Sequence, residues 1–146
     1  MSLFKNIARA KQLIDFSGLN VKGTKIYPTD TDYYMELWDV GCALGEYKYN
    51  NKPVDRGQYL CLSRHVKTYT TAGKFAVGFI ADHYVKNPED MVPAAECYVR
   101  AYCYTGQPLD ENGEYKLEPP PKPMTVKELQ DWFVRECRYR RRISLD

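Results

Sequence analysis

The sequence feature that most constrains the fold is a continuous apolar run from Phe75 to Ala81. A strand with apolar side chains on both of its faces is typical of a sheet that helices cover on both sides. Shortly before this run, residues 55–71 carry Leu62, Val66 and Tyr69 at the spacing of one helix face. A helix that leads into a doubly covered strand predicts a layered α/β domain.

The rest of the chain predicts further helices and strands. Before this unit we expect a first helix capped by Ser2, a short strand at 20–27, and strands at 32–38 and 42–49 that form a hairpin. After it we expect a regularly alternating strand at 95–104, a short strand at 115–117, and a last helix that opens with the capping box Thr125 to Glu128. The order αβββαββα, in which the short segment at 115–117 is not counted, describes a mixed α/β sheet flanked by helices.

The length of the chain suits one domain with one core, since it has 146 residues. We assign residues 1–118 to the core and residues 119–124, which are rich in proline, to an extended spacer. Residues 125–146 then form a C-terminal helix that packs on the same domain.

Composition argues against several classes of protein. Five cysteines without a CxxC pair, and two histidines without ligand spacing, predict free thiols in a reducing compartment and no structural zinc. No apolar run approaches the ~18 residues that span a bilayer, so we expect a cytoplasmic protein that does not associate with membranes. The net charge of +2 does not by itself indicate nucleic-acid binding. An Arg cluster at 135–142 is either a solvated helix end or a docking segment for a protein partner.

Candidate chemistry centres on the tripeptide Glu46-Tyr47-Lys48. Residues i and i+2 of a strand point to the same face, so Glu46 and Lys48 are expected to be neighbours there. Tyr47 points away, but its backbone carbonyl is available as a further ligand. Oxygen ligands suit Mg²⁺ or Mn²⁺, which activates water and neutralises charge on a phosphate, and a lysine beside the metal assists the attacking water.

Asp32 joins this face if the hairpin has the right register. A three-residue loop at 39–41, with Gly41 last, pairs Trp38 with Cys42 and brings Asp32 opposite Lys48. A two-residue loop would send Asp32 to the other face of the sheet. The predicted site therefore depends on the geometry of one turn.

The run Ile26-Tyr-Pro-Thr-Asp-Thr-Asp32, followed by Gly45-Glu-Tyr-Lys48 and then Gly57-Gln58, resembles small phage-type proteins of the PD-(D/E)XK nuclease superfamily. This resemblance implies the restriction-endonuclease-like core, a divalent metal, hydrolysis of DNA phosphodiester bonds, and a phage or prophage origin. It implies Asp32 and Glu46 as metal ligands and Lys48 as the catalytic lysine. Gln58 resembles the glutamine of the RecB-like branch, where it would position the lysine or the phosphate.

Other polar residues near this segment have two interpretations each. Asp30 either assists Asp32 or only forms a turn, and Lys52 and Arg56 either contact DNA phosphates or belong to a solvated loop. Glu36 and His65 fit structural roles better than catalytic ones. The tyrosines around the site either pack the sheet or stack on bases.

Two functions remain open from the sequence. The first is a Mg²⁺- or Mn²⁺-dependent nuclease that acts on DNA, alone or as a homodimer. The second is a catalytically inactive nuclease-fold module that binds nucleic acid or a protein partner, because the first-helix Glu of many superfamily members is absent before Glu36. A variant of the second is an accessory protein that docks through the Arg-rich C-terminus.

Overall fold

A computed structural model describes residues 14–26, 28 and 30–145 of the chain. The chain divides into two compact units, Met1–Asp30 and Thr31–Asp146. In the first unit, the short 3₁₀ helix η1 spans Ser17–Leu19. The first helix predicted after Ser2 lies outside the described residues as far as residue 13.

The strand predicted at 20–27 is wrong over residues 20–26, which form turns instead. The backbone N–H of Val21 donates to the carbonyl of Ile26 at 2.8 Å, and Gly23 has a φ of +78°. That left-handed conformation reverses the chain, so an extended strand cannot form there.

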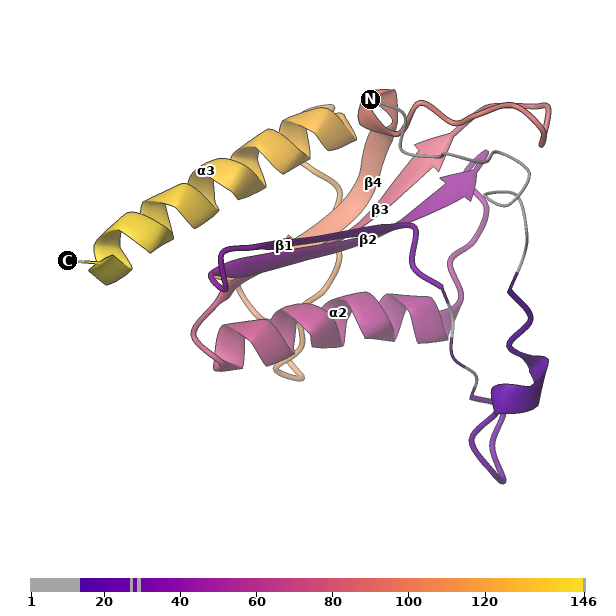
Figure 1. The fold of residues 1–146 in the computed structure, drawn as a ribbon, viewed down its shortest axis with the longest axis horizontal. Helices are drawn as coiled ribbons and strands as arrows, with labels where there is room; N and C mark the ends of the chain where they lie inside the picture. Colours follow the sequence, from indigo (N-terminus) through magenta and orange to yellow (C-terminus); the bar gives the residue numbers. More distant parts are fainter. Residues whose placement is uncertain (1–13, 27, 29, 146) are drawn as a thin grey trace. The chain divides into compact units, whose positions relative to one another are not determined.

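The second unit is a four-stranded mixed sheet with helices on both faces, which is an α+β architecture. Its elements are β1 Tyr33–Leu37, β2 Gly41–Tyr49, α2 Arg56–Thr71, β3 Phe75–His83, η2 Ala94–Glu96, β4 Tyr98–Tyr104 and α3 Val126–Leu145. The strand order is β1-β2-β3-β4, in which β2 and β3 are parallel and both edge strands are antiparallel to their neighbours. Helix α2 lies along one face of the sheet and α3 along the other (Figure 1).

Strand β3 is buried from Phe75 to Asp82, as the continuous apolar run predicts. Its odd-numbered residues pack with α3, in a cluster that includes Phe79, Leu129 and Phe133. Its even-numbered residues pack with α2, in a cluster that includes Ile80 and Leu62. The alternation of a single strand therefore builds both halves of the core.

The hairpin has a three-residue loop, but the loop lies one residue earlier than predicted. Leu37 pairs with Gly41, so the loop is Trp38–Val40, and Trp38 and Asp39 take the positive φ values of 53° and 57°. Gly41 does not close the turn. A Cβ atom at Gly41 would lie 2.5 Å from the Cys137 Sγ, so its glycine instead allows close approach of α3.

Two predictions on the last strands are also wrong. Regular alternation in β4 fails because a bulge lies opposite Ile80 and Ala81, so Val99 packs in the α3 cluster whereas Ala101 packs in the α2 cluster. An extra residue in one strand of a pair shifts the facing of every residue beyond it. The predicted strand at 115–117 is not present, and only a single bridge from Glu118 to Tyr102 forms beside it.

Both helix starts follow the sequence signals. Asp55 caps α2 by accepting the Gln58 N–H at 2.7 Å. In the predicted capping box of α3, the Glu128 N–H donates to Thr125 Oγ1 at 3.2 Å, and the Thr125 N–H donates to Glu128 Oε1 at 3.2 Å. These caps fix where each helix begins against the sheet.

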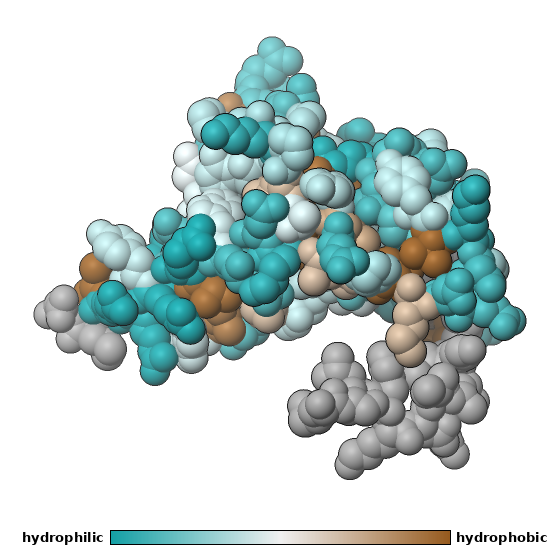
Figure 2. Space-filling view, turned by 90° about the horizontal axis from the view of Figure 1, so that it is seen from above, coloured by the Kyte–Doolittle hydropathy of each residue, from teal (hydrophilic) through white to brown (hydrophobic). Residues whose placement is uncertain are grey.

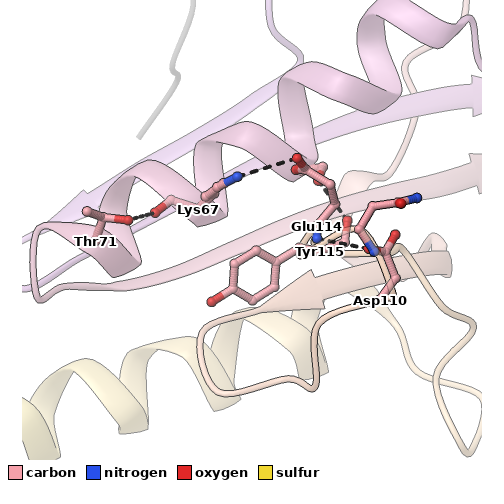
Figure 3. Close-up of polar contacts among 7 residues, drawn as sticks. Lys67, Thr71, Asp110, Glu114 and Tyr115 are labelled. Carbon is pink, nitrogen blue, oxygen red and sulfur yellow. Dashed lines mark hydrogen bonds and ion pairs between the residues drawn. The ribbon is translucent and has the colours of Figure 1, made fainter.

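The turn at 110–115 is fastened to α2 (Figure 3). Asp110 Oδ1 accepts the Glu114 N–H at 2.9 Å, and Glu114 reaches the Lys67 ammonium at 3.4 Å. Deeper down, the buried Ser63 hydroxyl donates to the Tyr115 carbonyl at 2.7 Å. These contacts hold Tyr115 and Leu117 over the α2 half of the core without strand pairing.

The face that carries α3 is mainly polar, with brown apolar side chains in small separate patches (Figure 2). On α3, the Arg140 guanidinium stacks on Phe75 and that of Arg141 on Trp38, each 4.9 Å from the ring centroid. Arg135, Arg138 and Arg142 are exposed. In the described part of the chain, no helix is both long and apolar enough to cross a membrane.

Candidate active site

The candidate site lies on the α2 face of the sheet, at the end where β2 and β3 finish. The observed register differs from the predicted one by two residues, since Tyr34 pairs with Leu44 and Tyr33 with Gly45. A shift of two preserves the facing of every side chain. Continued one residue beyond β1, this register would bring Asp32 opposite Glu46 instead of Lys48.

The Asp32 carboxylate completes the hairpin where β1 has ended. Its Oδ2 accepts the backbone N–H of Tyr47 at 2.8 Å, and the rest of the residue is exposed. This contact ties Asp32 to the strand that carries the E-x-K tripeptide. One oxygen of an exposed carboxylate accepts this bond, and the group retains further lone pairs for a ligand.

Glu46 is the buried member of this set, with only 9% of its surface exposed. It follows Gly45 and pairs with Ile80 of β3 in the middle of the sheet. Tyr47 points to the opposite face, where its ring packs edge-on against Phe79 with centroids 6.2 Å apart. The alternation predicted for Glu46, Tyr47 and Lys48 is thus present.

Lys48 and Gln58 meet directly, although they are ten residues apart in the sequence. The Lys48 ammonium donates to Gln58 Oε1 at 2.5 Å, in a half-buried position. Gln58 is held there because it occupies the first turn of α2, whose start Asp55 fixes. The family resemblance predicts that these two residues act together, and the crossover from β2 through α2 to β3 brings them into contact.

An ion pair that was not predicted from the sequence lies beside Lys48. Asp82 is the register partner of Lys48 in the parallel pair and is 7% exposed. The Arg100 guanidinium binds both oxygens of Asp82, with the Nε–Oδ2 distance at 2.9 Å, and its Nη2 also donates to the Lys52 carbonyl at 2.9 Å. This pairing raises the pKa of Arg100.

One half of this ion pair had a signal in the sequence. Asp82 is the first charged residue after the apolar run, and a charge in a buried strand calls for a partner. No sequence signal identified Arg100 as the partner, because the bulge in β4 at its position is not marked by glycine or proline.

The remaining candidates lie around this set or apart from it. Lys52 and Arg56 are exposed, the first in the loop after β2 and the second at the start of α2. Asp30 belongs to the first unit, Met1–Asp30. Glu36 is exposed and accepts the Asp39 N–H at 2.8 Å, which fits a structural role in the turn.

Cysteine chemistry is not favoured at this site. All five cysteines, each within the described part, are free. Burial raises the pKa of Cys103 to about 12 and that of Cys137 to about 11, so neither supplies a thiolate at neutral pH. The better candidate for chemistry is the group of polar side chains described above, which we call the polar row: Asp32, Glu46, Lys48, Gln58, Asp82 and Arg100.

A divalent metal fits this row through its carboxylates. The described residues include no group of three or more His, Cys, Asp or Glu side chains placed to hold a metal. Mg²⁺, however, keeps several of its waters and commonly uses only one or two protein carboxylates. Asp32, bound to the Tyr47 N–H next to Glu46, and Glu46 itself are the two carboxylates at this end of the hairpin, which is the number that this smaller requirement needs.

Searches with protein-family models, among curated proteins and among solved structures found no match to this chain.

Proposed function

We propose that this chain is a metal-dependent nuclease with a restriction-endonuclease-like fold that hydrolyses phosphodiester bonds in DNA. The observation that carries the proposal is the 2.5 Å bond between Lys48 and Gln58, in the strand that also carries Glu46 and whose Tyr47 N–H binds Asp32. The order of hairpin, crossover helix and parallel strand supports the fold assignment, because this order sets two carboxylates and a lysine at one end of a mixed sheet.

Each residue has a distinct role in this proposal. Asp32 and Glu46, with the Tyr47 carbonyl, would hold Mg²⁺ or Mn²⁺, which supplies Lewis-acid activation of water and neutralises charge on the phosphate. The Lys48 ammonium orients the attacking water and offsets the negative charge that develops on the phosphate. Gln58 accepts a hydrogen bond from the Lys48 ammonium and so fixes the direction in which the other two N–H groups point.

The direct test is cleavage of single-stranded, duplex and branched DNA by the full chain, with Mn²⁺ or Mg²⁺ and with EDTA. We expect metal-dependent cleavage that Glu46→Gln and Lys48→Met each reduce by about a hundredfold or more, since each removes a charge used in the transition state. Lys127→Met is the matched control, because Lys127 is exposed on α3 and pairs with Asp131 of the same helix. Cleavage by Lys48→Met at the wild-type rate would contradict the assignment.

A second function is favoured by one specific observation. The bond from the Tyr47 N–H to Asp32 gives that carboxylate a purely structural use, as expected of a nuclease-fold module that binds nucleic acid or a protein without catalysis. Thermal unfolding with Mn²⁺ separates the two functions. A nuclease should be stabilised by the metal, and Asp32→Asn should remove that effect, whereas an inactive module should not respond.

A further inference from the structure

Asp82 is a buried carboxylate of the polar row, and the proposed mechanism gives it no role. It is the register partner of Lys48 in the parallel pair of β2 and β3, so both side chains leave the sheet on the same face. Neighbouring strands lie about 4.8 Å apart, a distance that the flexible side chain of a lysine spans. The Lys48 ammonium therefore has two acceptors within reach, the Gln58 amide and the Asp82 carboxylate.

The acceptor that Lys48 binds is the weaker of the two. Its ammonium donates to Gln58 Oε1 at 2.5 Å, and among the described residues Asp82 forms its ion pair with Arg100 and not with Lys48. A carboxylate has a full negative charge whereas an amide oxygen has only a partial one, so an ammonium that can reach both should bind the carboxylate. The contact between Lys48 and Gln58 therefore requires that another group occupies Asp82.

Arg100 is that group. Its guanidinium binds both oxygens of Asp82 through Nε and Nη2, with the Nε–Oδ2 distance at 2.9 Å. Nη2 also donates to the Lys52 carbonyl at 2.9 Å, and this bond fixes the plane of the guanidinium. A planar fork that matches both oxygens of a carboxylate binds it with more specificity than the single charge of an ammonium. Arg100 thus fills the place at Asp82 that Lys48 could otherwise take.

The backbone of β4 is irregular at the residue that makes these contacts. Ile80 pairs with Ala101 and Ala81 pairs with Val99, so Arg100 is the extra residue of the bulge. A bulge re-aims a side chain out of the regular alternation, and bulges are frequent next to active sites. The irregularity of β4 therefore serves the contact between Arg100 and Asp82.

We propose that Arg100 is a positioning residue of the candidate active site: by holding Asp82, it keeps the Lys48 ammonium on Gln58 and available to the scissile phosphate. This inference rests on the proposed nuclease function for the reaction that Lys48 assists. Arg100 acts on that reaction only through Asp82 and Lys48. The contact between Lys48 and Gln58 can also be observed without any substrate, so the inference has a test that does not depend on cleavage.

The first test is the crystal structure of the full chain with Arg100→Met, which removes the charge and leaves an apolar side chain. We expect the Lys48 ammonium to leave Gln58 and to bind the uncompensated Asp82. In the double variant Asp82→Asn with Arg100→Met no carboxylate competes, so Lys48 should lie on Gln58 as in the wild type. A Lys48–Gln58 contact that persists in Arg100→Met would overturn the inference.

The second test is the kinetics of DNA cleavage with Mn²⁺, at a temperature at which thermal unfolding shows each protein to be folded. We expect Arg100→Met to lower kcat by about tenfold or more and to change KM by less than about threefold, because Lys48 acts in the transition state. The double variant should recover at least half of the lost kcat on a logarithmic scale. Arg100→Lys, which keeps a positive charge at Asp82, should also recover it in part. Lys127→Met is again the control.

A double variant that is as slow as a folded Arg100→Met would overturn the inference, because Arg100 would then act by a route other than Asp82. If Arg100→Met does not fold, the double variant still decides, since loss of its Lys48–Gln58 contact would contradict the proposed role. Failure of the nuclease proposal is a separate outcome. A wild type that cleaves no DNA contradicts the nuclease, whereas the crystal structures still show whether Arg100 controls the position of Lys48.

Discussion

His65 shows how one partly buried side chain acquires a structural role. Its Nε2 lies 3.1 Å from the Cys42 carbonyl, and because a carbonyl only accepts, Nε2 must carry the proton. The ring packs against Tyr69 with centroids 4.8 Å apart. Burial lowers the pKa of His65 below its ordinary 6.5, so the folded protein holds this ring neutral.

This lowered pKa predicts a pH dependence of stability. Below pH 6.5 the unfolded chain binds a proton at His65 that the folded chain resists, so stability falls as pH drops from 6.5 toward the lower folded pKa. One such group contributes at most about 1.4 kcal/mol per pH unit. Denaturation of wild type and His65→Phe should show a shallower acid slope in the variant. Parallel slopes would contradict the prediction.

At the scale of elements, the position of α2 depends on its first turn. The Asp55 carboxylate accepts the Gln58 N–H, and the same turn presents Gln58 to Lys48. An uncapped helix start frays, because its first N–H groups have no partners within the helix. The cap therefore supports both the stability of α2 and the placement of a candidate site residue.

Replacing the cap should have a measurable cost. We expect Asp55→Ala to lower the free energy of unfolding by about 1 kcal/mol, and Asp55→Ser to retain most of the wild-type stability because serine also caps. Urea denaturation measures both variants. If Asp55→Ala were as stable as Asp55→Ser, the capping bond would not contribute as described.

Which elements the sequence predicts depends on whether their signals are local. Helices α2 and α3 have apolar residues at helical spacing, strand β3 is a continuous apolar run, and all three lie where predicted. Gly41 misled the turn prediction because its glycine serves a contact with Cys137, almost a hundred residues away. The parity of the hairpin is still the predicted one, since the observed register differs by two residues. The Asp82–Arg100 pair cannot be predicted from local sequence signals, since it requires a bulge and the pairing of β3 with β4.

At the scale of the whole molecule, the Asp82–Arg100 pair joins three separate segments. Asp82 comes from β3, Arg100 from β4, and the Lys52 carbonyl from the loop after β2. The Asp82 side chain is 8% exposed and that of Arg100 is 26% exposed. A carboxylate buried to this degree depends on its partner, because desolvation penalises the charge when it stands alone.

This dependence predicts a strong coupling between the two side chains. Arg100→Met should destabilise the fold by about 3 kcal/mol, near the lower end for a broken buried pair because the arginine is partly exposed. The double variant Asp82→Asn with Arg100→Met should recover at least half of that loss, since no charge is left buried. Lys127→Met, which breaks the exposed pair with Asp131, should cost only about 0.5 kcal/mol. Urea denaturation of the wild type, of Asp82→Asn, of Arg100→Met and of the double variant measures the coupling. Additive effects of the two single changes in the double variant would show that the pair is not a buried charge dependent on its partner.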